Sequence, residues 1–178
     1  MRTFVARTGL VAVSLTWAAV CLVGCPAPVF SIQGHYEGSW VGTADYLQGE
    51  PVCPITMTLA QSGTLMGGTI QFAHDCLLPE DLAGAVAVPT LKVPLRGSIN
   101  RLGEMTFAFD PDEWPQEEIP FELHIDFEAQ AHDADANGFA EAISGTFTFQ
   151  WLASEVPGIG QIKGEATGTF NLDLAEAF

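Results

Sequence analysis

Apolar and polar residues alternate along most of the chain from Gln33 onward. The clearest stretch is FELHIDFEA, residues 121–129, in which an apolar residue stands at every second position and a polar or charged residue stands between. Successive side chains of a β-strand point to opposite faces, so this period gives one face for a core and one face for water. The pattern therefore predicts half-buried strands rather than amphipathic helices.

About eight stretches share this pattern, and short turn-like links join consecutive ones. They cover residues 34–46, 53–63, 64–76, 90–99, 105–109, 121–129, 143–151 and 161–174. Pro94 lacks the N–H that a strand ladder needs, so its stretch is expected at an edge or a bulge. Only residues 79–87 suggest a short helix. Because closure removes the sticky edges of a sheet, we predict an all-β domain, an antiparallel up-and-down barrel of about eight strands, with a related sandwich as the alternative.

Glycine followed by threonine or serine recurs inside the predicted strands, at Gly68, Gly97, Gly145 and Gly168. Glycine within a strand permits the sharp bends that a small barrel requires. We therefore interpret these glycines as points where strands bend.

Cys53 begins one predicted strand, and Cys76 ends the next. A two-residue turn at Ser62–Gly63 would place residue 53 opposite residue 72, and a bulge at Gly67–Gly68 or a longer loop would move that partner toward Cys76. The two cysteines are thus expected at the open end of one hairpin, where an exported protein forms a disulfide. Such a bridge stabilises by roughly 3 kcal/mol in the chain-entropy model. Two free thiols or a weak metal pair are the alternatives.

Residues 1–24 have the layout of a targeting segment. Arg2 and Arg7 precede an uncharged apolar run that is too short for a good membrane span. The run ends in LVGC, Leu22 to Cys25, which resembles the lipobox at which bacterial lipoproteins are cleaved and acylated. The resemblance implies that Cys25 becomes the lipid-modified N-terminus. A plain secretory signal cleaved near the same place is the alternative.

On this interpretation the chain divides into a signal peptide at 1–24, a lipidated cysteine with a short tether at 25–33 and one barrel domain at 34–178. Several acyl chains anchor a protein stably in a membrane, whereas a single chain holds weakly. Pro26 follows the lipidated cysteine, and by analogy with enterobacterial sorting this favours the outer membrane. We therefore expect a lipoprotein of the bacterial cell envelope, either periplasmic or surface-exposed.

The chain is strongly acidic, with 22 acidic against six basic residues and a formal net charge of −16. Removal of Arg2 and Arg7 with the signal peptide would make it more acidic still. Such a charge repels nucleic acid and anionic lipid surfaces. Cations and basic proteins remain as charged partners, although solubility alone also accounts for the charge.

Residue patterns that indicate catalysis are missing from the sequence. The four histidines lie outside the Gly-x-Ser-x-Gly and His-Glu-x-x-His motifs, and no glycine-rich loop precedes a helix. His124, Asp126, Glu128 and His132 share the outward side of one predicted strand, where they form either a transition-metal stripe or a solvated face. We therefore expect a protein that is not an enzyme.

The stretch HDADANG, residues 132–138, has the first half of a calcium-binding loop. In the EF-hand spacing, ligands stand at positions one, three, five, seven and nine, with glycine at six. The corresponding ligands here are Asp133, Asp135, Asn137, the carbonyl of Phe139, and Glu141. Position twelve is Ser144 instead of a bidentate glutamate, so we expect weak affinity for Ca²⁺. The alternative is an acidic hairpin turn centred on Asn137–Gly138, since both residues tolerate positive φ.

Gly38-Ser39-Trp40 lies in the first predicted strand, and later hairpins end in Gly-Thr followed by an aromatic residue. This arrangement resembles the calycin group, which comprises lipocalins, avidins and bacterial metalloprotease inhibitors. The resemblance implies a calycin-like barrel with Trp40 as the plug of the barrel floor. Lipocalins often pair this tryptophan with an arginine of the last strand, where this chain has Lys163.

Three functions are compatible with these features. An eight-stranded barrel either fills with its own side chains or holds one small ligand. We expect an exported, lipid-anchored binding module that holds a small apolar ligand in the barrel. The first alternative is a structural or interaction lipoprotein whose filled barrel presents loops to another protein, as a protease inhibitor does. The second is a calcium-binding surface protein.

The lipobox predicts a covalent lipid on Cys25. In a bacterial host fed with a fatty-acid analogue, the wild-type chain should incorporate the label and the Cys25→Ala variant should not. Equal labelling of the two proteins would contradict the assignment of the anchor.

Overall fold

The computed structural model describes residues 30–47, 49–73, 76, 79, 90–109, 122–156 and 160–178, with the backbone alone at 154–156 and 160–162. The predicted signal peptide, Cys25 and nearly all of the predicted helix at 79–87 lie outside these residues. Within the described part, no helical segment is long and apolar enough to cross a membrane.

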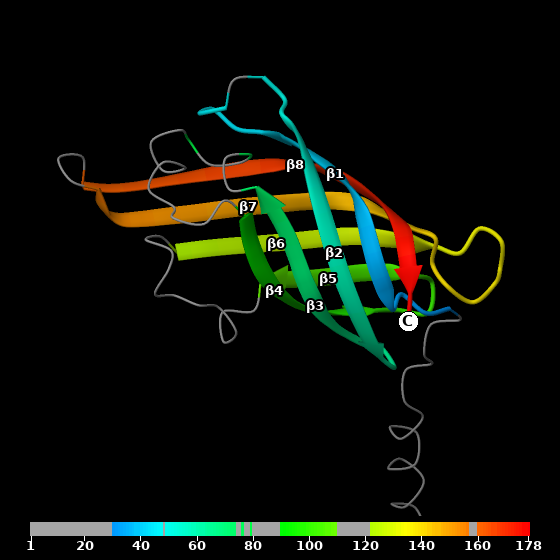
Figure 1. The fold of residues 1–178 in the computed structure, drawn as a ribbon. Helices are drawn as coiled ribbons and strands as arrows, with labels where there is room; N and C mark the ends of the chain where they lie inside the picture. The colour runs from blue at the N-terminus through cyan, green and yellow to red at the C-terminus, as the bar shows by residue number, and fades with distance from the viewer. Residues whose placement is uncertain are drawn as a thin grey trace, which may run out of the picture.

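Eight strands account for nearly all of the described chain (Figure 1). They are β1 (Gly34–Thr43), β2 (Val52–Ser62), β3 (Leu65–Ala73), β4 (Thr90–Ile99), β5 (Glu104–Phe109), β6 (Glu122–His132), β7 (Ala142–Val156) and β8 (Gly160–Ala177). Each strand overlaps one stretch of alternating sequence, so the period-two pattern predicted the strands correctly.

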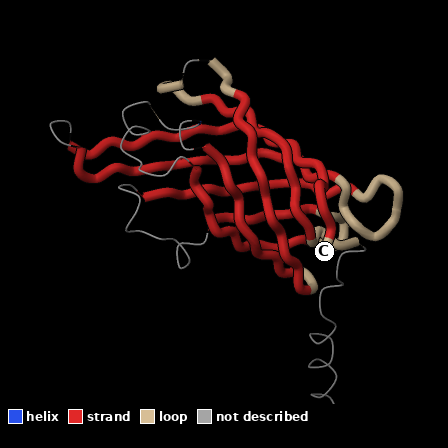
Figure 2. The backbone as a smooth tube through the Cα atoms, in the orientation of Figure 1, coloured by secondary structure: helices blue, strands red, loops and turns tan. Residues whose placement is uncertain are grey.

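Each strand pairs with the next in antiparallel orientation, and β1 also pairs with β8. The sheet is therefore a closed barrel in the order β1 to β8, whose crossing strands are visible in Figure 2. The prediction of an eight-stranded up-and-down barrel is confirmed.

The chain direction divides the connections between the two ends of the barrel. One end, called here the turn end, carries the β2–β3 turn at 63–64, the β4–β5 turn at 100–103 and the β6–β7 loop at 133–141 (Figure 1). The opposite end carries the Cys53–Cys76 disulfide and is called here the disulfide end.

Aromatic side chains fill the described interior. The Phe107 and Phe127 rings stack with centroids 4.6 Å apart, and Phe127 lies edge-on to Phe170 at 5.5 Å. Trp40 contacts Phe72 at 4.6 Å and Phe147 at 4.8 Å, and Phe147 in turn lies 6.5 Å from Phe127. These rings form one continuous cluster, and all of them are buried.

Trp40 is fully buried, as expected for an interior tryptophan. Its backbone pairs with Cys53 on one side and Phe170 on the other, so Trp40 lies nearer the disulfide end than Tyr36 does. The residue of β1 whose side chain reaches the turn end is Tyr36, which donates a hydrogen bond to the carbonyl of Ala140.

The segment before β1 closes the turn end. Ile32 is fully buried and belongs to the core, and its N–H donates to Oε1 of Gln61 at 2.9 Å. Ser31 forms a parallel bridge with Phe139 of the β6–β7 loop. The last residues of the predicted tether therefore pack as part of the fold, although β1 itself begins at Gly34.

The disulfide between Cys53 and Cys76 is present, with a Cα–Cα distance of 5.8 Å. The register that leads to it differs from both routes suggested by the sequence. Ser62 pairs with Leu65, and pairing continues without a bulge through Gly67 and Gly68. The turn is thus Gly63–Thr64, one residue later than Ser62–Gly63. Gly63 has φ +63° and takes the first central position, as a type II′ turn requires, and the shift moves the partner of Cys53 toward Cys76.

Pro94 lies in β4 opposite Thr69 of β3. Among the described residues, Thr90–Pro94 pair with β3, and the pairing of β4 with β5 begins at Leu95.

The glycines of the recurrent Gly-Thr and Gly-Ser pairs lie where neighbouring strands approach closely. A Cβ atom at Gly68 would lie 2.0 Å from the carbonyl oxygen of Thr58, and one at Gly145 would lie 2.1 Å from that of Glu128. Gly67 differs from its neighbour, because a Cβ atom there would meet nothing nearer than the Leu95 carbonyl oxygen at 3.6 Å. Of these two adjacent glycines, only Gly67 therefore has room for a Cβ atom.

We predict that Gly68→Ala lowers the free energy of unfolding by about 2 kcal/mol or more, because the strand backbones must separate to admit the methyl group. Gly67→Ala is the matched control and should change it by less than about 1 kcal/mol. Chemical denaturation of the two variants beside the wild type measures both values. Equal stability of the two variants would contradict the close strand contact at Gly68.

Candidate functional site

The β6–β7 loop projects from the turn end and contains the predicted calcium ligands (Figure 2). Positive φ occurs at Gly138 (+90°), as the hairpin interpretation expected, but its companion is Ala136 (+56°) and not Asn137. The reason is that Asn137 N–H is held by two carboxylates, from Asp133 Oδ1 at 3.1 Å and Asp135 Oδ1 at 3.0 Å. The loop therefore folds around its acidic side chains instead of forming a tight two-residue turn.

Both aspartates turn back toward the loop backbone. Asp133 also accepts the N–H of Gly138 through Oδ2 at 3.1 Å. Asp135 also accepts the side-chain amide of Asn137 through Oδ2 at 3.1 Å. These hydrogen bonds satisfy backbone donors of the loop and fix the direction of the two carboxylates.

Glu141, at the end of the loop, brings a third carboxylate to the same place. One ligand oxygen from each of Asp133, Asp135 and Glu141 lies within 4.8 Å of the others. Oε2 of Glu141 accepts the N–H of Ala134 at 2.6 Å, which holds the glutamate across the loop. Among the residues that the structure describes, no other three His, Cys, Asp or Glu side chains gather in this way.

The second oxygen of Glu141, Oε1, is buried and has no hydrogen-bond partner. A buried carboxylate oxygen without a donor is unfavourable unless a proton or a cation compensates it. The neighbouring Glu141 carboxyl is the main cause that lowers the pKa of Asp135, while desolvation acts in the opposite direction.

Tyr36 connects this loop to the core. Burial raises the pKa of its hydroxyl, and the negative charge of Glu141 raises it further. The hydroxyl therefore stays neutral and donates to the carbonyl of Ala140 at 3.1 Å. The sequence carries no signal for this contact between the core and the loop, because 104 residues separate the two groups.

The remaining predicted ligands are the side chain of Asn137 and the carbonyl of Phe139. Oδ1 of Asn137 accepts the N–H of Phe139 at 2.8 Å, so this oxygen caps the loop backbone. The backbone beside Phe139 is engaged by the segment before β1, because Ser31 N–H donates to the Gly138 carbonyl and Ala140 N–H donates to the Ser31 carbonyl, both at 2.8 Å. The structure therefore brings together the three carboxylates of the predicted set, while Asn137 contacts two of them as a hydrogen-bond donor and uses its own side-chain oxygen for this cap.

The outward stripe of β6 does not gather into a comparable group within the described chain. His124 Nε2 lies 2.8 Å from Asp126 Oδ2, and both side chains are about half exposed. His132 Nε2 lies 3.4 Å from the hydroxyl of Ser144, at the other end of the strand. The stripe thus has the character of a solvated face.

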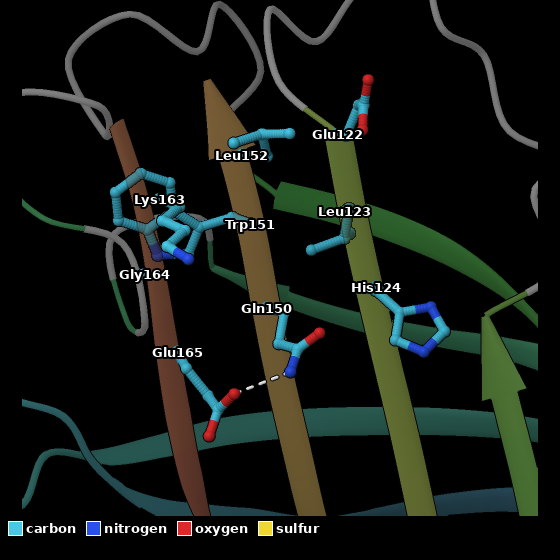
Figure 3. Close-up of a pocket in the computed structure, with 9 residues that line it drawn as sticks. All are labelled: Glu122, Leu123, His124, Gln150, Trp151, Leu152, Lys163, Gly164 and Glu165. Carbon is cyan, nitrogen blue, oxygen red and sulfur yellow. Dashed lines mark hydrogen bonds between the residues drawn. The ribbon is translucent and has the colours of Figure 1, made fainter. Parts of the chain in front are cut away.

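A surface groove lies at the disulfide end, across β6, β7 and β8 (Figure 3). Its lining residues are Glu122, Leu123, His124, Gln150, Trp151, Leu152, Lys163, Gly164 and Glu165. The amide of Gln150 donates to Glu165 at 2.6 Å, and Trp151 Nε1 donates to the hydroxyl of Tyr46 at 3.1 Å. The described lining residues include no serine, threonine or cysteine.

The loop carboxylates are therefore the candidate functional site. Three oxygen donors without nitrogen or sulfur suit a hard cation. Comparison of the chain with models of protein families and with curated proteins found no match.

Proposed function

We propose that this protein is an exported, lipid-anchored, non-enzymatic β-barrel that binds calcium through its β6–β7 loop. The observation that carries the proposal is the convergence of Asp133, Asp135 and Glu141, together with the buried and unpartnered Oε1 of Glu141. A cation at this place would compensate that oxygen and offset the repulsion among the three carboxylates.

Calcium fits this donor set better than magnesium or a transition metal does. Calcium accepts six to eight oxygen ligands in flexible geometry, whereas magnesium demands a near-ideal octahedron and dehydrates reluctantly. Three carboxylates leave several positions for water or for backbone carbonyls. Because Ser144 replaces the usual bidentate glutamate and lies within β7, the expected Kd is on the order of 10⁻⁴ to 10⁻³ M, as in extracellular modules.

Carriage of an apolar ligand inside the barrel receives less support. The interior positions of the described strands are occupied by Trp40 and a continuous cluster of phenylalanine rings. A filled barrel supports instead the alternative in which loops and outer surface contact a partner. The calycin-like relationship remains a proposal that rests on the barrel and on the Gly38-Ser39-Trp40 motif.

Calorimetric titration tests the calcium site directly. We expect heat of binding for the wild-type protein at millimolar calcium and little heat for Asp135→Ala, which removes one of the three carboxylates. Asp126→Ala is the matched control, since Asp126 is an exposed carboxylate of β6 outside the loop, and it should titrate like the wild type. Identical heats from the wild type and Asp135→Ala would exclude the loop as the binding site.

Glu141→Gln separates the two roles of this side chain. The amide oxygen can still accept the N–H of Ala134, while the negative charge is removed. With a chelator present, we expect this variant to be more stable than the wild type by about 1 kcal/mol, because one of three like charges is lost.

Millimolar calcium should raise the melting temperature of the wild type by a few degrees, roughly 2–4 °C per kcal/mol for a domain of this size, and leave Glu141→Gln unchanged. Thermal unfolding in chelator and in calcium measures both effects. Equal stabilisation of the two proteins by calcium would contradict a role for Glu141 as a ligand.

A further inference from the structure

Exposed large apolar side chains are concentrated at one end of the barrel. Within the described residues they are Val52, Leu65, Leu102, Phe139 and Phe178, and only Val52 lies at the disulfide end. The other four lie at the start of β3, in the β4–β5 turn, in the β6–β7 loop and directly after β8, which all meet at the turn end (Figure 1). These four residues are called here the apolar crown.

The side chains of the crown are exposed to solvent although they are apolar. Leu102 is 73% exposed, Leu65 67% and Phe178 63%, whereas the other large apolar residues of the described strands are mostly buried. Leu65 and Leu102 stand beside Gly63 and Gly103, which both have positive φ and form the turns that present these side chains to the outside. Four apolar tips around one rim are more than the scattered single residues of an ordinary surface.

The N-terminal segment enters the fold at the same end. Phe30 packs against the β4–β5 turn, since a Cβ atom at Gly103 would lie 2.7 Å from the Phe30 ring. Only residues 26–29 lie between Cys25 and Phe30. An extended chain spans at most about 3.6 Å per residue, so the Cα atoms of Cys25 and Phe30 lie within roughly 18 Å of each other. A lipid on Cys25 would therefore hold the turn end, and no other part of the barrel, against the bilayer.

We propose that the apolar crown inserts into the interfacial region of a phospholipid bilayer, so that the barrel stands on the membrane by its turn end. This inference rests on the lipid anchor of the proposed function but not on its calcium site. Apolar side chains at such an interface are buried about 5–10 Å into the boundary between headgroups and acyl chains. The disulfide end, with the groove across β6 to β8, would then face away from the membrane.

Charge limits the kind of lipid. The loop carboxylates of Asp133, Asp135 and Glu141 lie beside the crown, and the chain as a whole is strongly acidic. Arg101, next to Leu102, is an exposed basic residue of the same rim. The crown therefore fits a zwitterionic surface better than an anionic one, and calcium in the loop would lower the repulsion from phosphate groups.

Site-directed fluorescence tests the insertion. The disulfide occupies Cys53 and Cys76, the lipid would occupy Cys25, and Cys21 would leave with the signal peptide, so an introduced cysteine is a unique labelling site. The full lipidated chain carrying Leu102→Cys or Leu65→Cys is labelled with bimane and reconstituted in phosphatidylcholine vesicles that contain a nitroxide-labelled lipid. Glu122→Cys, an exposed position at the disulfide end, is the matched control.

The proposal predicts that the nitroxide quenches the Leu102→Cys and Leu65→Cys labels roughly twofold or more beyond the Glu122→Cys label, with a blue-shifted emission. Because both crown side chains point into solvent, neither substitution should disturb folding, and the two positions check each other. Protein that floats with the vesicles but shows equal quenching at all three positions would overturn the docking alone. Protein that fails to float would overturn the anchor and the docking together. Labels shielded only at high protein concentration would assign the crown to a second copy of the chain and overturn the docking.

Discussion

Closure of the sheet by pairing of β1 with β8 is the constraint on which the rest of the structure depends. The two strands are in register from Gly34 opposite Ala177 to Thr43 opposite Thr167, with one shift after His35. With both edges joined, every strand has one face toward the interior and one face toward the outside. The period-two pattern therefore separates interior from exterior residues in the same way around the whole barrel. The tight contacts at Gly38 and Gly168 belong to this seam, because a Cβ atom at either position would lie within 2.0 Å of a carbonyl oxygen of the partner strand.

Closure of the barrel also limits what its interior can hold. Eight strands enclose a space just wide enough for their own side chains or for one small ligand. This chain supplies its interior with aromatic rings, which bury more surface per residue than aliphatic side chains and here contact one another across the barrel. The consequence is that chemistry is left to the ends and the outer face. Within the described chain, Nε1 of Trp40 is an interior polar atom that is buried without a hydrogen-bond partner.

Sequence reasoning succeeded where information is local and failed where distant segments meet. The alternation in residues 121–129 specified β6, and the spacing of Asp133, Asp135 and Glu141 identified carboxylates that do converge. The turn at Gly63–Thr64 was misplaced by one residue, because the same dipeptide signal fits two registers until the type II′ geometry chooses between them. The bridge of Ser31 to the β6–β7 loop had no sequence signal, since it joins backbone groups more than 100 residues apart.

The topology explains why the segment before β1, the β6–β7 loop and the crown share one end. In an up-and-down barrel with an even number of strands, the chain enters and leaves at the same end, and every second connection returns to it. The segment at Phe30–Gln33, the β6–β7 loop and Phe178 are therefore neighbours by construction, whatever their sequences. The fold already places these segments close together, so only their side chains remain to be selected. Ser31 is held by Gly138 and Ala140, and the loop is held by its own carboxylates, so a cation bound there would stiffen the backbone that receives the tether. Two backbone hydrogen bonds would in this way connect calcium binding, if it occurs in the loop, to the orientation of the barrel on the proposed anchor.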